Sequence, residues 1–227
     1  MTRETAGSRR VRDSFEAARS EGRIAFVPYV VAGYPDIATS ERVALAAIDA
    51  GADVLELGLP YSDPLADGAT VQRASAVALA AGATLDGSLT LLERVCGARP
   101  ATPVLVMGYV NQFLGPVGAD AISRRLASAG AAGAIVPDLT PDEGAPLEKA
   151  FEKHGLALIY LVAPTTPQDR TAYIAARGGG FLYCVSLTGV TGARQALPSA
   201  LRGLVTRVKS VSPLPVAVGF GVSRPAH

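Results

Sequence analysis

Short apolar runs alternate along this chain with longer amphipathic segments. The apolar runs span residues 24–33, 53–59, 104–110, 133–138, 156–162, 180–186 and 215–221. They are almost continuously apolar, which is typical of parallel strands that are covered by helices, whereas a half-exposed strand would alternate. The pattern therefore predicts seven parallel strands.

Ala-rich amphipathic segments lie between the apolar runs and predict helices, for instance over 40–51, 119–130, 141–155 and 199–210. Gly follows many of these segments, as it does at helix C-termini. Residues 68–98 have room for two helices, 69–82 and 86–96, where one would connect the neighbouring strands.

A repeating strand–helix order without a composition break predicts one α/β domain over residues 1–227, either a doubly wound sheet or a (β/α)8 TIM barrel. We favour the barrel because Gly-rich and Pro-rich loops follow nearly every strand, and because no G-x-G-x-x-G follows the first one. The sequence ends at 223–227, where a seventh helix is expected to begin. We therefore expect strand 8 and its flanking helices to be missing from this chain, which leaves the domain incomplete at the C-terminus.

Composition narrows the functional classes. The 227 residues are 49% hydrophobic and 18% charged, enough to form a large core, and a net charge of +1 argues against a nucleic-acid binder. The polar N-terminus lacks a signal peptide, and no window has the ~18 apolar residues of a membrane span. Cys96 and Cys184 have no metal-ligand spacing, so we expect free thiols and a cytoplasmic location.

One carboxylate stands inside a predicted strand. Glu56 lies between Leu55 and Leu57, near the strand's C-terminal end, where barrels place their catalytic groups. Burial there would raise its pKa toward neutrality and suit general acid–base catalysis. The alternatives are a structural glutamate paired with an arginine from a neighbouring layer, and a glutamate that faces a wet cavity. On the same evidence Asp67, before Gly68, reads as a helix N-cap and Asp63 as a turn residue.

Other features bear on the chemistry. The Gly-rich loop over 186–198 and the short stretch 219–221 could offer backbone N–H groups to a phosphate. The three lysines lie in predicted helices, which argues against a Schiff-base aldolase. We expect no metal site, because His154 reads as a helix C-cap and His227 is terminal. Proton transfer is left to carboxylates.

Five collinear segments, 26–36, 55–72, 108–113, 186–194 and 219–225, resemble the tryptophan synthase α subunit family. The resemblance spans essentially the whole chain. It implies a (β/α)8 lyase that cleaves indole-3-glycerol phosphate to indole and glyceraldehyde 3-phosphate by a retro-aldol reaction. It also implies no cofactor in this chain, and a β-subunit partner that carries pyridoxal phosphate in an α2β2 heterotetramer.

The resemblance also assigns roles to residues. Glu56 would be the acid–base group, and Asp67 would hold the indole N–H. The remaining substrate contacts would be Tyr29, Tyr109, Ile135, Tyr183 and Phe220 around indole, with Thr191, Gly192 and Gly221 at the phosphate. Pro60 and Asp63 would face the β subunit. Tyr29 stands where many members have Phe.

Three alternatives stay open at this point. The chain could be a free-standing indole-glycerol phosphate lyase, or a non-catalytic barrel that binds and regulates a β subunit. It could also be another phosphate-binding barrel such as a sugar-phosphate isomerase, for which Asp138 is the best second carboxylate.

Overall fold

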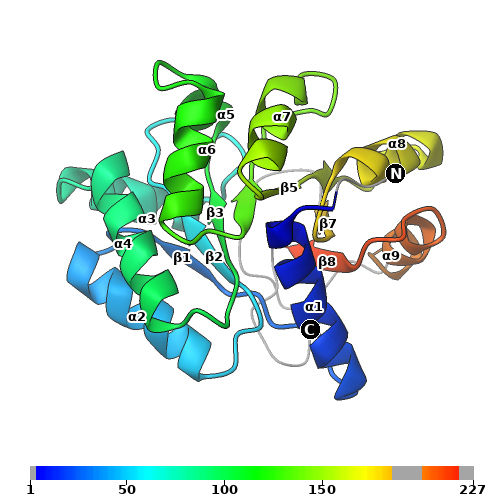
Figure 1. Cartoon of the computed structure of the whole chain (residues 1–227), viewed down its shortest axis with the longest axis horizontal. Helices are drawn as coiled ribbons and strands as arrows, with labels where there is room; N and C mark the ends of the chain where they lie inside the picture. Colours follow the sequence, from blue (N-terminus) through cyan, green and yellow to red (C-terminus); the bar gives the residue numbers. More distant parts are fainter. Residues whose placement is uncertain (1–3, 186–200, 220–227) are drawn as a thin grey trace.

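The computed structural model describes residues 4–185 and 201–219. Parallel strands stand at the centre and helices surround them (Figure 1). The strands are β1 (Tyr29–Val31), β2 (Leu55–Gly58), β3 (Val104–Met107), β4 (Gly133–Ile135), β5 (Ala157–Ile159), β6 (Leu161–Val162), β7 (Leu182–Val185) and β8 (Val216–Gly219). The helices are α1 (Ala6–Ser20), α2 (Ile37–Asp49), α3 (Ala69–Ala80), α4 (Leu85–Ala98), α5 (Val110–Leu114), α6 (Ala119–Ser128), α7 (Ala145–Lys153), α8 (Gln168–Arg177) and α9 (Leu201–Lys209).

The strands pair in chain order, all parallel. One sheet runs β1-β2-β3-β4-β5 and the other β6-β7-β8. Each of the seven predicted apolar runs contains a strand, and the run 156–162 contains two, divided at Tyr160. The division joins the two sheets, because β5 pairs with β4 while β6 pairs with β7, and the Tyr183 N–H donates to the Tyr160 carbonyl at 3.1 Å.

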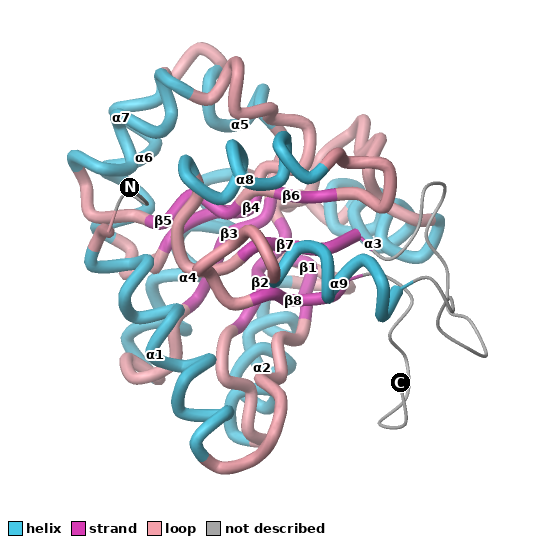
Figure 2. The backbone as a smooth tube through the Cα atoms, turned by 90° about the vertical axis from the view of Figure 1, so that its right-hand side faces the viewer, coloured by secondary structure: helices cyan, strands magenta, loops and turns pink. Residues whose placement is uncertain are grey.

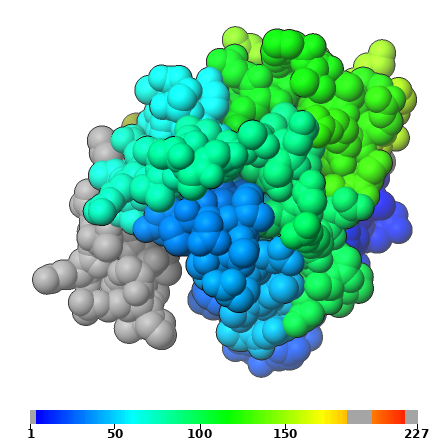
Figure 3. Space-filling view, turned by 90° about the vertical axis from the view of Figure 1, so that its left-hand side faces the viewer, coloured from blue at the N-terminus to red at the C-terminus, as the bar shows by residue number. Residues whose placement is uncertain are grey.

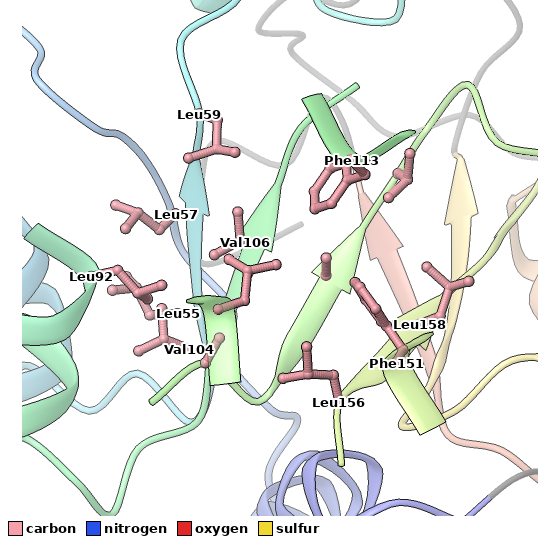
Figure 4. Close-up of a cluster of buried hydrophobic side chains, with 14 of the residues drawn as sticks. Leu55, Leu57, Leu59, Leu92, Val104, Val106, Phe113, Phe151, Leu156 and Leu158 are labelled. Atoms are coloured by element: carbon pink, nitrogen blue, oxygen red, sulfur yellow. The ribbon is translucent and has the colours of Figure 1, made fainter. Parts of the chain in front are cut away.

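Both faces of β2, β3, β4 and β5 are buried, as the continuous apolar runs predict, whereas β7 and β8 include half-buried residues. On the outer face, Leu55, Leu57 and Val106 pack with Leu92 of α4 and Phe151 of α7 (Figure 4). The inner face carries a separate cluster that includes Val11, Leu105, Met107, Ile135, Ile159 and Phe181. Because side chains alternate along a strand, Leu55 and Leu57 on the outer face place Glu56 on the inner one.

Helix α1 closes the amino-terminal end of the strands and was not predicted from the sequence. The Gly7 N–H donates to the carbonyl of Gly155, just before β5, at 2.8 Å. Phe15 packs on Phe181, just before β7, with ring centroids 5.1 Å apart. The segment is too polar for its apolar face to stand out in sequence. The opposite, carboxyl end of the strands is the face that remains for a site.

Helices cover the strands from the sides, and the two outermost strands have one neighbour each among the described residues. In Figure 3, α2, α3 and α4 lie against one another on one face, and Figure 2 shows the strands enclosed between helices from a second side. Within the described residues, β1 pairs only with β2 and β8 only with β7, as expected for open edges. Ile24 and Phe26, which precede β1, are 88% and 53% exposed.

Candidate active site

Glu56 is the buried acid of the barrel interior. It lies in the middle of β2, opposite Tyr29 of β1 and Leu105 of β3 in the strand register. Its side chain is 4% exposed, and burial alone raises the pKa of its carboxyl to about 8. No arginine among the described residues pairs with it, so that part of the chain gives no support to the ion-pair alternative. A carboxyl that titrates near neutrality can both give and take a proton at working pH.

Two tyrosines lie over glycines on neighbouring strands around this carboxyl. A Cβ added to Gly58 would lie 2.0 Å from the Tyr29 hydroxyl, and one added to Gly219 would lie 2.0 Å from the Tyr183 hydroxyl. A larger residue at either position would therefore displace the tyrosine ring that lies over it. Burial raises the pKa of both tyrosines, and the nearby charges of Glu56 and Asp67 raise it further, so both phenols stay protonated.

Asp67 is held in place by Tyr109. The Tyr109 hydroxyl donates to Asp67 Oδ2 at 3.0 Å and accepts from the Ala66 N–H at 3.0 Å. Burial raises the pKa of Asp67, and the hydrogen bond from Tyr109 opposes that shift. The N-cap interpretation of Asp67 is wrong, since Gly68 is the N-cap of α3 and the Asp67 side chain bonds to Tyr109. Tyr109 itself, predicted within a strand over 104–110, lies beyond β3 as the N-cap of α5.

The loop between β2 and α3 is fastened to the start of α5 at further points. Gln112 Nε2 donates to the Pro60 carbonyl at 3.2 Å, and Asn111 Nδ2 donates to the Tyr61 hydroxyl at 3.0 Å. The rings of Tyr61 and Tyr109 stack with centroids 5.1 Å apart. Sequence reasoning missed these contacts, because short polar residues after a strand give no sign of which loop they touch.

Asp63 and Pro60 occupy the same loop, and they are less buried than Glu56 and Asp67. Asp63 is exposed and accepts a hydrogen bond from the Ser62 hydroxyl at 2.7 Å, as a turn residue does. Leu65 beside it is 91% exposed. Asp138, the candidate second acid of an isomerase, instead accepts from the Val110 N–H at 2.9 Å and orients α5.

The remaining predicted site residues divide into two groups. Ile135 is buried on the inner face of β4, in the same cluster as Leu105 and Met107. Thr191, Gly192, Phe220 and Gly221 lie outside the described residues, as does the predicted phosphate loop over 186–198. Of the stretch 219–221, only Gly219 is described, at the end of β8.

Several sequence expectations about other groups can be checked on the described residues. His154 is the C-cap of α7, as predicted. Cys96 and Cys184 are free and buried. Across 4–185 and 201–219 no cluster of His, Cys, Asp and Glu could hold a metal ion. No single helix in those ranges is long and apolar enough to cross a membrane, and α3 with α4 passes that test only as a pair bent by 106°.

The strand and helix arrangement defines a class, that of the (β/α)8-barrel proteins, and two buried carboxyl groups, those of Glu56 and Asp67, lie within it. Residues 15–227 match the family model of the tryptophan synthase alpha chain. The chain belongs to that family. It is therefore a carbon–carbon lyase of tryptophan biosynthesis that cleaves indole-3-glycerol phosphate.

Individual relatives agree. The chain is 47% identical over 218 residues to the tryptophan synthase alpha chain of Roseiflexus castenholzii, covering 96% of this chain and 83% of that one. Mycobacterium tuberculosis tryptophan synthase superposes with a TM-score of 0.87 at 41% identity, covering 94% and 80%. The alpha subunit from Legionella pneumophila superposes with a TM-score of 0.86 at 35% identity, covering 95% and 79%.

Proposed function

We propose that Glu56 and Asp67 carry the lyase reaction in this chain. Glu56 gives its proton to C3 of the indole ring, which becomes positively charged. The carboxylate that remains takes the proton of the glycerol hydroxyl next to the scissile bond. A carbonyl forms as the carbon–carbon bond breaks, and the electron pair of that bond returns to the ring. Glu56 ends protonated, and the products are indole and glyceraldehyde 3-phosphate.

The observation that carries this proposal is the burial of Glu56 without a partner among the described residues. An ordinary glutamate is ionised at neutral pH and has no proton to give, whereas a carboxyl with a pKa of about 8 is mostly protonated there. Desolvation is the cause of the shift, as it is for other buried acids that work as proton donors.

Asp67 is proposed to accept the indole N–H and to stabilise the charge that develops on the ring. Preorganised charge near the reacting ring favours the transition state. Support comes from its contacts, because the hydrogen bond from Tyr109 favours the ionised form and fixes the direction of the carboxylate. Tyr29, Tyr109, Tyr183 and Ile135 are proposed to line the indole pocket with Phe220. Thr191, Gly192 and Gly221 are proposed to bind the phosphate.

We further propose that the chain needs no cofactor of its own and works with a β subunit that carries pyridoxal phosphate, as an α2β2 heterotetramer in the cytoplasm. Membership of the alpha chain family implies such a partner in general. Pro60 and Asp63 are the proposed contacts, supported by the exposure of Asp63 and of Leu65 in the same loop. Loss of β-subunit activation in Asp63→Ala, with indole release by the α chain unchanged, tests this assignment.

We also infer that residues 1–227 form one domain. Support comes from the outer core, which extends from Val30 to Leu214 through helices on every side of the strands. A single cooperative unfolding transition, followed by circular dichroism and by tyrosine fluorescence, tests the inference.

The test of the catalytic proposal is indole release from indole-3-glycerol phosphate, with and without a β subunit. Glu56→Gln keeps the shape of the side chain and removes its proton chemistry, so release is expected to fall at least about a hundredfold. Glu93→Gln, the same change at an exposed position of α4, is the matched control and is expected to leave release unchanged. Undiminished release from Glu56→Gln would refute the assignment. β-subunit activation without any indole release by wild type would indicate a non-catalytic partner.

A further inference from the structure

Tyr29 and Glu56 are direct neighbours on the inner face of the barrel. Their Cα atoms are partners in the parallel ladder between β1 and β2. The tip of the Tyr29 ring rests on Gly58, two residues beyond Glu56 on the same strand and the same face, where an added Cβ would lie 2.0 Å from the hydroxyl oxygen and 2.5 Å from Cζ. The ring therefore crosses β2 on the carboxyl-end side of Glu56, which is the side of the site.

Both polar groups of this pair lack a hydrogen bond. Among the described residues, none bonds to the Tyr29 hydroxyl or to the Glu56 carboxyl. Buried polar groups in folded proteins nearly always have partners, so an exception calls for an explanation. One explanation accounts for both groups, since they lie on adjacent strands: they form a hydrogen bond with each other in a state that differs from the resting state.

We propose that Tyr29 is a positioning residue for Glu56, whose hydroxyl donates a hydrogen bond to the carboxylate that Glu56 becomes once it has given its proton to the substrate. This inference rests on the proposed acid–base role of Glu56. A neutral carboxyl in an apolar site needs no donor, whereas a buried carboxylate without one is costly. Tyr29 is suited to the task because it stays protonated and so always has a hydrogen to donate.

Few other groups can act on Glu56. The titratable groups that face it among the described residues are Tyr29 of β1, Tyr183 of β7 and Asp67 after β2, with Tyr109 next to Asp67. The inner faces of β3, β4, β5, β6 and β8 contribute apolar side chains: Leu105, Met107, Ile135, Ala157, Ile159, Leu161 and Ala217. Within residues 4–185 and 201–219, no lysine or arginine shifts the pKa of Glu56. The Tyr29 hydroxyl is therefore the neighbouring donor on the strand that pairs with Glu56.

The experiment compares wild type with Tyr29→Phe, which keeps the ring and deletes only the hydroxyl. The Glu56 carboxyl is titrated by carbon-13 NMR with labelled glutamate, its signal being the one that disappears in Glu56→Gln. A lost hydrogen bond to the charged form is expected to move the midpoint about one pH unit higher. The inflection of kcat against pH is expected to move with it, and kcat at pH 7 to fall about tenfold while KM changes little.

Tyr173→Phe is the matched control, since Tyr173 is an exposed tyrosine of α8 whose ring lies beneath the guanidinium groups of Arg170 and Arg177. It is expected to titrate and turn over as wild type does. If Tyr29→Phe also keeps the wild-type midpoint and kcat, the inference is overturned while the role of Glu56 stands. Activity that survives Glu56→Gln would overturn the role of Glu56 instead, whatever Tyr29→Phe does.

Discussion

At the scale of single residues, the site depends on keeping a carboxyl out of water. Burial makes the charged form of Glu56 unfavourable, and the described residues offer no cation to offset it. Burial of Glu56 therefore lowers the stability of the protein at neutral pH and at the same time provides a proton donor. Asp67 differs from Glu56, because burial raises its pKa but the hydrogen bond from Tyr109 opposes that rise.

The burial of Glu56 predicts a pH-dependent stability. Its folded pKa of about 8 exceeds the unfolded value, so the folded state holds more protons than the unfolded state between about pH 4.5 and 8. The stabilisation that the folded state gains from the proton on Glu56 is fully present below that window and is lost as the pH rises through it. The side chain in Glu56→Gln is never ionised. As the pH rises across the window, the free energy of unfolding of this variant is therefore expected to increase relative to that of wild type, by up to about 1.4 kcal/mol per pH unit.

Urea unfolding at several pH values measures this difference. Glu93→Gln is the control, because the same substitution at an exposed site should run parallel to wild type. A difference between Glu56→Gln and wild type that stays flat from pH 5 to 8 would show that the carboxyl is already ionised in the folded protein.

The bond from Tyr109 to Asp67 makes a second prediction at this scale. Tyr109→Phe removes the donor that favours the ionised carboxylate, so the pKa of Asp67 should rise and the acid side of the kcat/KM profile should move to higher pH. At pH 7 we expect kcat/KM to fall about tenfold. Steady-state kinetics of indole release across pH measure both effects, and a profile identical to wild type would contradict the assignment.

How far the sequence could predict these residues follows from their surroundings. Glu56 could be found because a charged residue inside an apolar strand breaks a local pattern. The direction of the Asp67 side chain could not, because the partner that turns it away from the helix start is Tyr109, 42 positions further along the chain. Gln112 and Asn111 escaped prediction for the same reason: their partners, Pro60 and Tyr61, lie in another loop.

At the scale of elements, two features go beyond the strand–helix alternation. The run 156–162 divides at Tyr160, whose hydroxyl donates to Glu148 Oε1 at 2.8 Å. Arg177 Nη2 of α8 donates to Glu148 Oε2 of α7 at 2.8 Å, so this buried group ties two outer helices to the division. Periodicity predicts that 156–162 is extended but cannot reveal a change of partner within it, since both halves are equally apolar.

Helix α1 is the other such feature, and Gly7 tests how it closes the barrel. A Cβ added there would lie 1.8 Å from the Ala132 carbonyl oxygen. Gly7→Ala must therefore push α1 away from the strands, and we expect a loss of about 1–3 kcal/mol in the free energy of unfolding.

Gly97→Ala provides the control, because an added Cβ at Gly97 in α4 meets nothing within 4 Å. That variant should be at least as stable as wild type, since Ala favours a helix over Gly by about 1 kcal/mol. Urea denaturation measures both variants. Equal stability of Gly7→Ala and wild type would mean that α1 does not pack closely against the ends of the strands at Gly7.

At the scale of the whole molecule, the barrel separates stability from chemistry. The amino-terminal end of the strands is closed by α1, and the outer face is covered by helices. Among the described residues, the surroundings of Glu56 on the inner face are apolar side chains, tyrosines and Asp67. The alternation of apolar runs and amphipathic segments in the sequence predicted that helices cover the strands. The neighbours of each strand and the closure by α1 needed the three-dimensional structure, because they depend on contacts between distant segments.

The central claim is that burial in this barrel turns Glu56 into a proton donor near neutral pH. The most direct measurement is a carbon-13 NMR titration of the Glu56 carboxyl in the wild-type chain. We predict a midpoint near pH 8, coinciding with an inflection in kcat for indole release. A midpoint near 4.5, the value of an ordinary glutamate, would contradict the account.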